Sequence, residues 1–329
     1  MILQLFKSTG FKGLLVNLLV IILFWSVSFL QGSAGATGYN VEPMPLYGLL
    51  TSHLNSGGAS VFVFFGLFLL ISYLLVHFNT SLFFLQERTY MPSLIYVIFC
   101  SVFVEAHDAS PAIPAAILLL LALARVMDAY RKNGTAFCFF DASLLIGTGI
   151  LFYANLVWFG LILVVGVIIL RGYNIKEIML SLTGLIIPSL LLAGYLYVFD
   201  SDPGVILQRF ISNISVRHAG TELPGVKLII ISVCLLLLFY ALLLLLPRIN
   251  NMKIKSGKLF ILLIWTLLVA VAVAIYSPAS VSDIVYLGGI PAGYMITNQI
   301  LNSRKKILNE IILVTLLLLA FASQLSGLL

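Results

Sequence analysis

Charged side chains are scarce in this chain. Only 9% of its 329 residues are Asp, Glu, Lys or Arg, whereas 61% are hydrophobic. A soluble domain carries about 25% charged residues, so this chain has too little polar surface to cover a folded core in water. Lipid must therefore be its solvent, and the composition predicts an all-α, polytopic membrane protein whose first partner is the bilayer.

Motifs for the common cofactors are missing as well. Cys100, Cys138 and Cys234 form no C-x-x-C pair, so neither a zinc site nor a disulfide framework is supported. Gly147 and Gly149 lack the following Lys-Ser/Thr of a phosphate-binding loop. The sequence contains no nucleotide-binding fingerprint and no haem-type histidine pair at mid-span, so we expect no cofactor and no resident metal.

Ionisable groups are nearly absent from the apolar runs. Ion pumps and proton-coupled transporters keep such groups at mid-depth, so their scarcity counts against an ion-driven carrier. The net charge of +6 arises in short turns between apolar runs. Lys and Arg in such turns set membrane orientation, and we therefore expect no nucleic-acid partner.

Eleven apolar runs bounded by polar turns predict the membrane spans. They cover residues 13–31, 59–77, 92–105, 111–129, 142–154, 156–170, 177–199, 226–246, 258–276, 282–298 and 307–325. The first run resembles a secretory signal. Its apolar core, Gly13 to Leu30, has 18 residues and exceeds the usual length of about 7–15, which favours a retained span. We expect residues 1–329 to form one transmembrane domain.

The positive charges predict the orientation. With the N-terminus in the cytoplasm, fifteen of the eighteen Lys and Arg residues fall in inner segments, and only Arg209, Arg217 and Lys227 fall in outer ones. This bias predicts an inner N-terminus and an outer C-terminus.

The apolar run 142–170 is 29 residues long. As one helix it would measure about 44 Å and would invert every later loop, which would roughly halve the charge bias. As two helices of about 21 Å each it returns to the cytoplasm. We therefore predict a short helical hairpin with its tip near Tyr153-Ala-Asn155. That tip either reaches the outer surface or ends inside the protein, where its helix ends need polar partners.

Two outer loops are long enough to hold helices that lie in the membrane interface, near residues 45–56 and 203–214. The apolar stripe of the first consists of Leu46, Leu49, Leu50 and Leu54. The apolar positions of the second are Ile206, Phe210 and Ile214. In the penultimate span the helix-weakening residues are Gly288, Gly289, Pro291 and Gly293. They predict a broken span, which lipid tolerates only against other helices or a cavity.

Side chains that suit catalysis collect on the predicted outer face. The catalytic candidates are Glu42, Glu105, His107 and Asp108. A carboxylate or a histidine among them could act as a general base, although Glu105 to Asp108 also fits an ordinary turn. The substrate-binding candidates are His53, Arg209, Arg217 and His218. Arginine and histidine suit a phosphate or an anionic lipid, and a plain solvated loop is the alternative.

Charged and polar residues also ring the predicted inner face. They are Glu87, Arg88, Arg131, Lys132, Asp141, Arg171 and Tyr173 with its neighbouring polar turn. These basic turns could dock a partner protein or an anionic ligand. We expect Asp141 at the N-terminus of the first hairpin helix, where its charge opposes the helix dipole.

Several segments resemble an uncharacterised family of integral membrane proteins of Bacteroidota. The segments are Pro45 to Leu50, Glu87 to Tyr96, Phe139 to Tyr153, Ile169 to Asn174 and Ser181 to Pro188. The resemblance implies a multi-pass protein of a bacterial inner membrane and implies no activity.

The architecture is also similar to that of membrane-embedded, polyprenyl-phosphate-dependent glycosyltransferases. Both place one span and an outer loop with an interfacial helix before many further spans. The likeness implies a polyprenyl-phosphate-linked substrate and an acidic base in the first outer loop, which Glu42 would supply. Related oligosaccharide polymerases and ligases imply Arg and His in a later outer loop, which Arg209, Arg217 and His218 would supply.

Three classes of function fit these observations. The first is cell-envelope glycan or lipid assembly on a lipid-linked substrate at the periplasmic face. The second is a transporter or flippase that uses the broken penultimate span and the hairpin. The third is a non-enzymatic subunit whose inner basic turns bind a partner.

Overall fold

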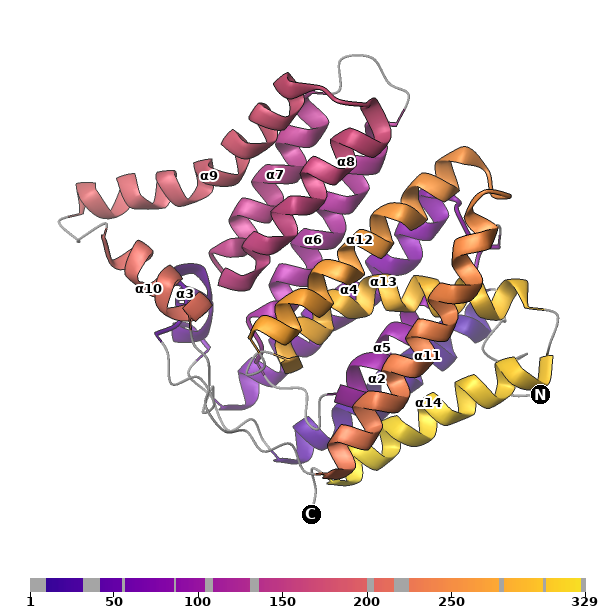
Figure 1. The fold of residues 1–329 in the computed structure, drawn as a ribbon. Coiled ribbons are helices and arrows are strands. Elements are labelled where there is room, and N and C mark those ends of the chain that lie inside the picture. The colour runs from indigo at the N-terminus through magenta and orange to yellow at the C-terminus, as the bar shows by residue number, and fades with distance from the viewer. Residues whose placement is uncertain are drawn as a thin grey trace.

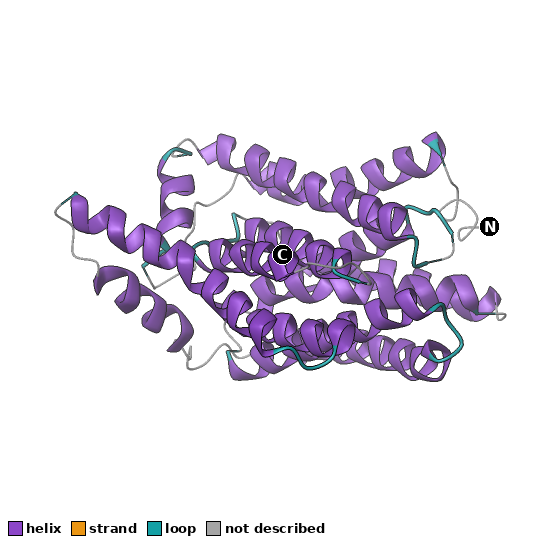
Figure 2. Ribbon diagram, turned by 90° about the horizontal axis from the view of Figure 1, so that it is seen from above, coloured by secondary structure: helices purple, strands orange, loops and turns teal. Residues whose placement is uncertain are grey.

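The computed structural model describes residues 10–31, 42–54, 57–85, 87–103, 109–130, 136–199, 204–215, 225–277, 281–303 and 306–326. Across these residues the regular secondary structure is entirely helical (Figure 2). The helices labelled in Figure 1 are α2 (Phe11–Gln31), α3 (Pro45–Ser52), α4 (Gly57–Leu82), α5 (Met91–Phe103), α6 (Ala112–Asp128), α7 (Ala136–Ile150), α8 (Leu161–Arg171), α9 (Ile175–Val198), α10 (Gly204–Ser215), α11 (Gly225–Ile249), α12 (Ile254–Tyr276), α13 (Val281–Asn302) and α14 (Lys306–Ser326). A 3₁₀ helix, η1 (Ala154–Gly160), precedes α8.

Each predicted apolar run coincides with a helix, and η1 and α8 together form the run 156–170. Seven helical segments of the described chain are long and apolar enough to cross a membrane. They lie in α2, α4, η1 with α8, α9, α11, α12 and α14. The chain is thus a helical, multi-pass membrane protein. The total of eleven spans and the orientation stay predictions.

Two helices form the centre of the bundle. Every residue of α5 from Met91 to Val102 is buried, and so is every residue of α13 from Asp283 to Ile300. The two helices run antiparallel, because the hydroxyl of Tyr96 donates to the carbonyl of Tyr286 at 3.2 Å while Gly293 lies against Pro92. The hydrophobic effect does not favour helix association in lipid. Close backbone approach and interhelical hydrogen bonds must therefore stabilise the packing of α5 against α13.

Helix α13 is continuous, which corrects the expectation of a broken penultimate span. It runs from Val281 to Asn302 with Pro291 inside it. Neighbouring helices enclose it, and the hydroxyl of Tyr294 donates to the carbonyl of Leu75 on α4 at 2.6 Å. Enclosure by protein explains how a helix with a proline is accommodated, since other helices can satisfy freed backbone groups.

Helices α7 and α8 form a hairpin that returns to the end where it begins. Gly184 of α9 lies against Ser143, and Gly147 of α7 lies against Leu185, so α7 and α9 run parallel. The link from α8 to α9 is short, from Gly172 to Asn174. The end of α8 therefore lies near the start of α7, as Figure 1 shows.

The first hairpin helix begins earlier in the chain than predicted. Helix α7 starts at Ala136, so Asp141 lies in its second turn and not at its N-terminus. The expectation that Asp141 opposes the dipole at the first residue of this helix was therefore wrong. The apolar residues Phe137 to Phe140 extend the helix beyond the charge-based boundary.

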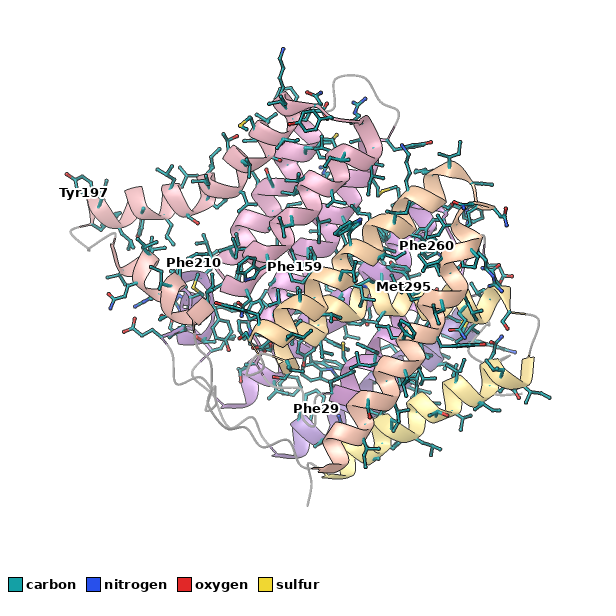
Figure 3. The ribbon with its side chains drawn as sticks, in the orientation of Figure 1. Phe29, Phe159, Tyr197, Phe210, Phe260 and Met295 are labelled. Carbon is teal, nitrogen blue, oxygen red and sulfur yellow. The ribbon has the colours of Figure 1, made fainter. Side chains whose placement is uncertain are left out.

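Helix α9 leaves the bundle after its first half. Its buried residues, Glu177, Ser181 and Gly184, all precede Pro188. The second half projects away from the bundle towards Tyr197, and α10 then returns towards it (Figures 1 and 3). This path brings α10 to the end of the bundle where α3 lies.

Candidate functional site

Helix α3 is attached to the tip of the hairpin. Pro45 occupies its first turn, where the missing N–H of proline has no intrahelical partner to lose. The backbone N–H of Leu46 donates to the carbonyl of Leu151 at 3.1 Å. Leu151 belongs to the turn that ends α7, so this bond joins the segment between α2 and α4 to the hairpin tip.

Tyr47 determines which face of α3 is turned towards the protein. It is the buried residue of this helix, and its hydroxyl donates to the carbonyl of Ala109 just before α6. Of the predicted leucine stripe, Leu50 and Leu54 pack against the core whereas Leu49 is exposed. The phenol has both an apolar body and a hydroxyl that finds a carbonyl, which favours its burial at this boundary.

Helix α10 has one face packed on the bundle. Ile206 is buried, and Phe210 and Ile214 pack against the core (Figure 3 labels Phe210). The adjoining face carries exposed Leu207 and Ile211. A wide apolar stripe, part packed on protein and part exposed, suits a helix between the protein and the membrane surface. Placement of α3 and α10 in the interface stays a prediction.

Glu42 and Arg209 meet across 167 residues of sequence. Nε of Arg209 donates to Oε2 of Glu42 at 2.9 Å. Nδ2 of Asn213, one turn later in α10, donates to the backbone carbonyl of Glu42 at 2.9 Å and to the carbonyl of Arg209 at 2.8 Å. Glu42 is therefore held against α10 at two points, its carboxylate by Arg209 and its backbone carbonyl by Asn213.

This ion pair is open to water. The Glu42 side chain is 70% exposed and the Arg209 side chain is 33% exposed. Exposed ion pairs contribute about 0–1 kcal/mol, so a competing anion can replace Glu42 at little energetic cost. A phosphate would give the guanidinium two parallel, charge-assisted hydrogen bonds in exchange.

Asn155 is buried at the hairpin tip. Only 3% of its surface is exposed, and its Nδ2 donates weakly to the hydroxyl of Tyr153 at 3.4 Å. No described residue donates a hydrogen bond to its Oδ1. A buried acceptor without a donor costs about 1–3 kcal/mol. From the sequence, Asn155 would need partners if it were buried and would be an ordinary turn residue if it were exposed at the tip; in the structure it is buried.

Asp283 lies in the first turn of the central helix α13 and has a structural role. It is buried in the first turn of α13 and accepts a hydrogen bond from the hydroxyl of Ser110 at 2.6 Å. The same hydroxyl oxygen accepts from the backbone N–H of Ala112 at 3.1 Å. The carboxylate thus joins the starts of α6 and α13, and the positive end of the α13 dipole favours its charge.

Three of the predicted site residues lie in the described chain. Glu42 and Arg209 are brought together, whereas His53 is exposed at the C-terminal cap of α3. The other five lie outside the described residues: Glu105, His107, Asp108, Arg217 and His218. Asn213 is a further contributor that was not among the predicted site residues.

A second charged pair lies at the opposite end of the hairpin. Nε of Arg171 is 3.9 Å from Oε1 of Glu177, and Glu177 is only 7% exposed. The sequence analysis named Arg171 and overlooked Glu177. The sequence did contain a signal for this pair. A basic residue ends one helix, and an acidic residue lies in the first turn of the next helix after a turn of three residues. Across the described residues, no group of three or more His, Cys, Asp or Glu side chains is placed to hold a metal ion.

A family model matches residues 46–326 of the chain, and the chain belongs to that family, DUF6427, which is described as a family of unknown function. No curated protein and no solved structure matches the chain.

Proposed function

We propose that this member of DUF6427 acts on a lipid-linked phosphate at the surface formed by the Glu42 segment, α3, α10 and the hairpin tip. The contact between Glu42 and Arg209 carries the proposal. It places a carboxylate and a guanidinium together at the end of a membrane bundle, beside an amphipathic helix that suits the headgroup region. The charge bias of the sequence supports the assignment of this end to the periplasmic face of a bacterial inner membrane.

The two side chains suit glycosyl transfer. Arg209 binds the phosphate oxygens and stabilises the charge that develops on the leaving phosphate. Its departure from Glu42 frees the carboxylate to act as general base. The acceptor hydroxyl gives its proton to Glu42, its oxygen bonds to the sugar C1, and the bond from C1 to the lipid-phosphate oxygen breaks. The polyprenyl-phosphate-dependent glycosyltransferase resemblance supports this substrate class.

The remaining predicted residues complete the hypothesis. Arg217 and His218 would add phosphate contacts, and Glu105, His107 and Asp108 would offer alternative bases. The transporter and the non-enzymatic subunit stay predictions. The transporter has lost one premise, because α13 is continuous and Gly289 is packed against Tyr96 and Cys100.

Substitution of the ion pair tests the proposal. In the source bacterium without its native copy, Arg209→Ala should lower the yield of lipid-linked and surface glycan by about 10- to 100-fold, since a charge-assisted hydrogen bond is lost. Glu42→Gln should lower the yield similarly. The measurement is mass spectrometry of the lipid-linked glycans, normalised to the membrane level of each variant.

Two controls separate chemistry from packing. The charge-reversed pair, Glu42→Arg with Arg209→Glu, keeps an ion pair but exchanges the positions of the base and the phosphate-binding cation. This double variant should therefore be as inactive as the single variants. Gln208→Ala, an exposed neighbour on the same helix, should leave the yield unchanged. Recovery of glycan in the reversed pair would show a purely structural contact and would overturn the proposal.

A further inference from the structure

The hairpin tip is an interrupted helix next to the proposed site. Helix α7 ends at Ile150, Tyr153 is extended with φ −139° and ψ 107°, and the chain continues as the 3₁₀ helix η1. Interrupted backbone at membrane depth is tolerated only where protein encloses it or where it lines a wet cavity.

The tip is connected to both helices that carry the proposed site. The bond from Leu46 to Leu151 attaches it to α3, and η1 packs against α10, which bears Arg209 and Asn213. It also contacts α12, where the ring of Trp158 meets that of Tyr276 at 6.1 Å between centroids. Trp and Tyr are enriched at membrane interfaces, and this contact agrees with a tip at headgroup depth.

Asn155 supplies the chemistry at the tip. Its side chain is 97% buried (3% exposed), and no described residue donates a hydrogen bond to its Oδ1. The oxygen accepts hydrogen bonds and cannot donate them, so a phosphate oxygen is excluded as its partner. A sugar hydroxyl or an amide N–H is the matching group.

We infer that Asn155 binds a hydroxyl or amide N–H of the glycan part of the substrate while Arg209 binds its phosphate. This inference rests on the proposed function and narrows its substrate class to a glycosyl phosphate or diphosphate. Asn155 touches the bound sugar and sets specificity for it. It takes no proton in the reaction.

Binding of two lipids to the purified full-length chain tests the inference. The probes are undecaprenyl phosphate and undecaprenyl diphosphate carrying N-acetylglucosamine, each in nanodiscs of phosphatidylethanolamine and phosphatidylglycerol, with retention measured by native mass spectrometry. Asn155→Ala should weaken retention of the glycosylated lipid by about tenfold, the size of one lost hydrogen bond, and leave undecaprenyl phosphate unaffected. Arg209→Ala should weaken both.

Matched variants make the result specific to the acceptor. Val157→Ala removes an apolar side chain from the same 3₁₀ helix and should leave both affinities unchanged. Asn155→Asp keeps an acceptor oxygen and should retain more of the preference for the glycosylated lipid than Asn155→Ala does.

Failure of the inference is distinguishable from failure of the proposed function. If the glycosylated lipid binds Asn155→Ala as well as it binds the unsubstituted chain, the inference is overturned and the site at Arg209 stands. An equal loss for both lipids would show a structural role for Asn155 and would also overturn it. If neither lipid binds the unsubstituted chain, the proposed function and the inference fall together.

Discussion

Gly293 lies where the two central helices come closest. A Cβ at this position would be 2.9 Å from the carbonyl oxygen of Pro92 and 3.5 Å from the backbone nitrogen of Tyr96. Backbone atoms cannot rotate away as a side-chain end can. The absence of a side chain at this residue therefore allows α5 and α13 to pack as they do.

Replacement of this glycine should separate the two helices. Gly293→Ala is expected to destabilise the protein by about 1–3 kcal/mol, the usual cost of overpacking a core. The measurement is the apparent melting temperature in detergent. Gly66→Ala is the matched control, because a Cβ there meets nothing within 4 Å. That variant should be neutral or stabilising by up to about 1 kcal/mol, since alanine favours helix more than glycine. Equal shifts in both variants would contradict this account of α5 and α13.

At the scale of elements, the hairpin and α9 are joined by a tight polar turn. Gly172 adopts φ 77°, a conformation that favours glycine, and the side chain of Asn174 accepts from the N–H of Lys176 at 3.2 Å. The turn brings Arg171 at the end of α8 to Glu177 in the first turn of α9. Glu177 Oε2 has no hydrogen-bond partner in the described chain, so its nearest compensation is that arginine.

Loss of one partner of this pair should therefore cost more than loss of both. Arg171→Met leaves a buried carboxylate without its cation and should destabilise the protein by about 1–3 kcal/mol. The double variant Arg171→Met with Glu177→Leu should recover most of that loss. A double-mutant cycle on thermal unfolding measures the coupling, and strictly additive effects would show that the two side chains act independently.

At the scale of the whole molecule, the hairpin decides how the second half of the chain is threaded. Because α8 returns to the end where α7 starts, the exposed turns at Tyr173 and Asn251 should both face the cytoplasm. Ser52 and Gln208 should face the other side. This arrangement agrees with the fifteen-to-three division of Lys and Arg residues.

Single cysteines test the threading. In a chain lacking Cys100, Cys138 and Cys234, cysteines at Ser52 and Gln208 should react with a membrane-impermeant maleimide on intact spheroplasts. Cysteines at Tyr173 and Asn251 should react only after the membrane is opened. Reaction of Tyr173→Cys and Asn251→Cys from opposite sides would contradict the predicted threading. Inversion of all four labelling results would place the proposed site on the cytoplasmic face.

Helical runs and the hairpin were accessible to sequence reasoning, whereas the site was accessible only in part. Long apolar runs are local features and the division of charge is an additive one, so both can be identified without knowledge of tertiary contacts. The assignment of Glu42 and Arg209 to the same predicted outer face suggested that they lie near each other. The sequence did not predict their direct contact. The burial of Tyr47 and the role of Asn213 depend on the carbonyls of Ala109 and Glu42, which lie 62 and 171 residues away in sequence.

The sequence by itself determined the solvent and the class of this protein, because hydrophobicity sums over residues without regard to their partners. The apolar runs of the sequence also located the helices that the structure forms there. Only the tertiary structure decided that the least apolar of the long helices, α13, is the enclosed centre, since enclosure depends on which neighbours its polar groups and glycines meet. The tertiary structure likewise decided that Asn155 is buried in the hairpin tip and that Glu42 is held by α10. Those relations join segments far apart in the chain, and pairing over such distances leaves no local pattern.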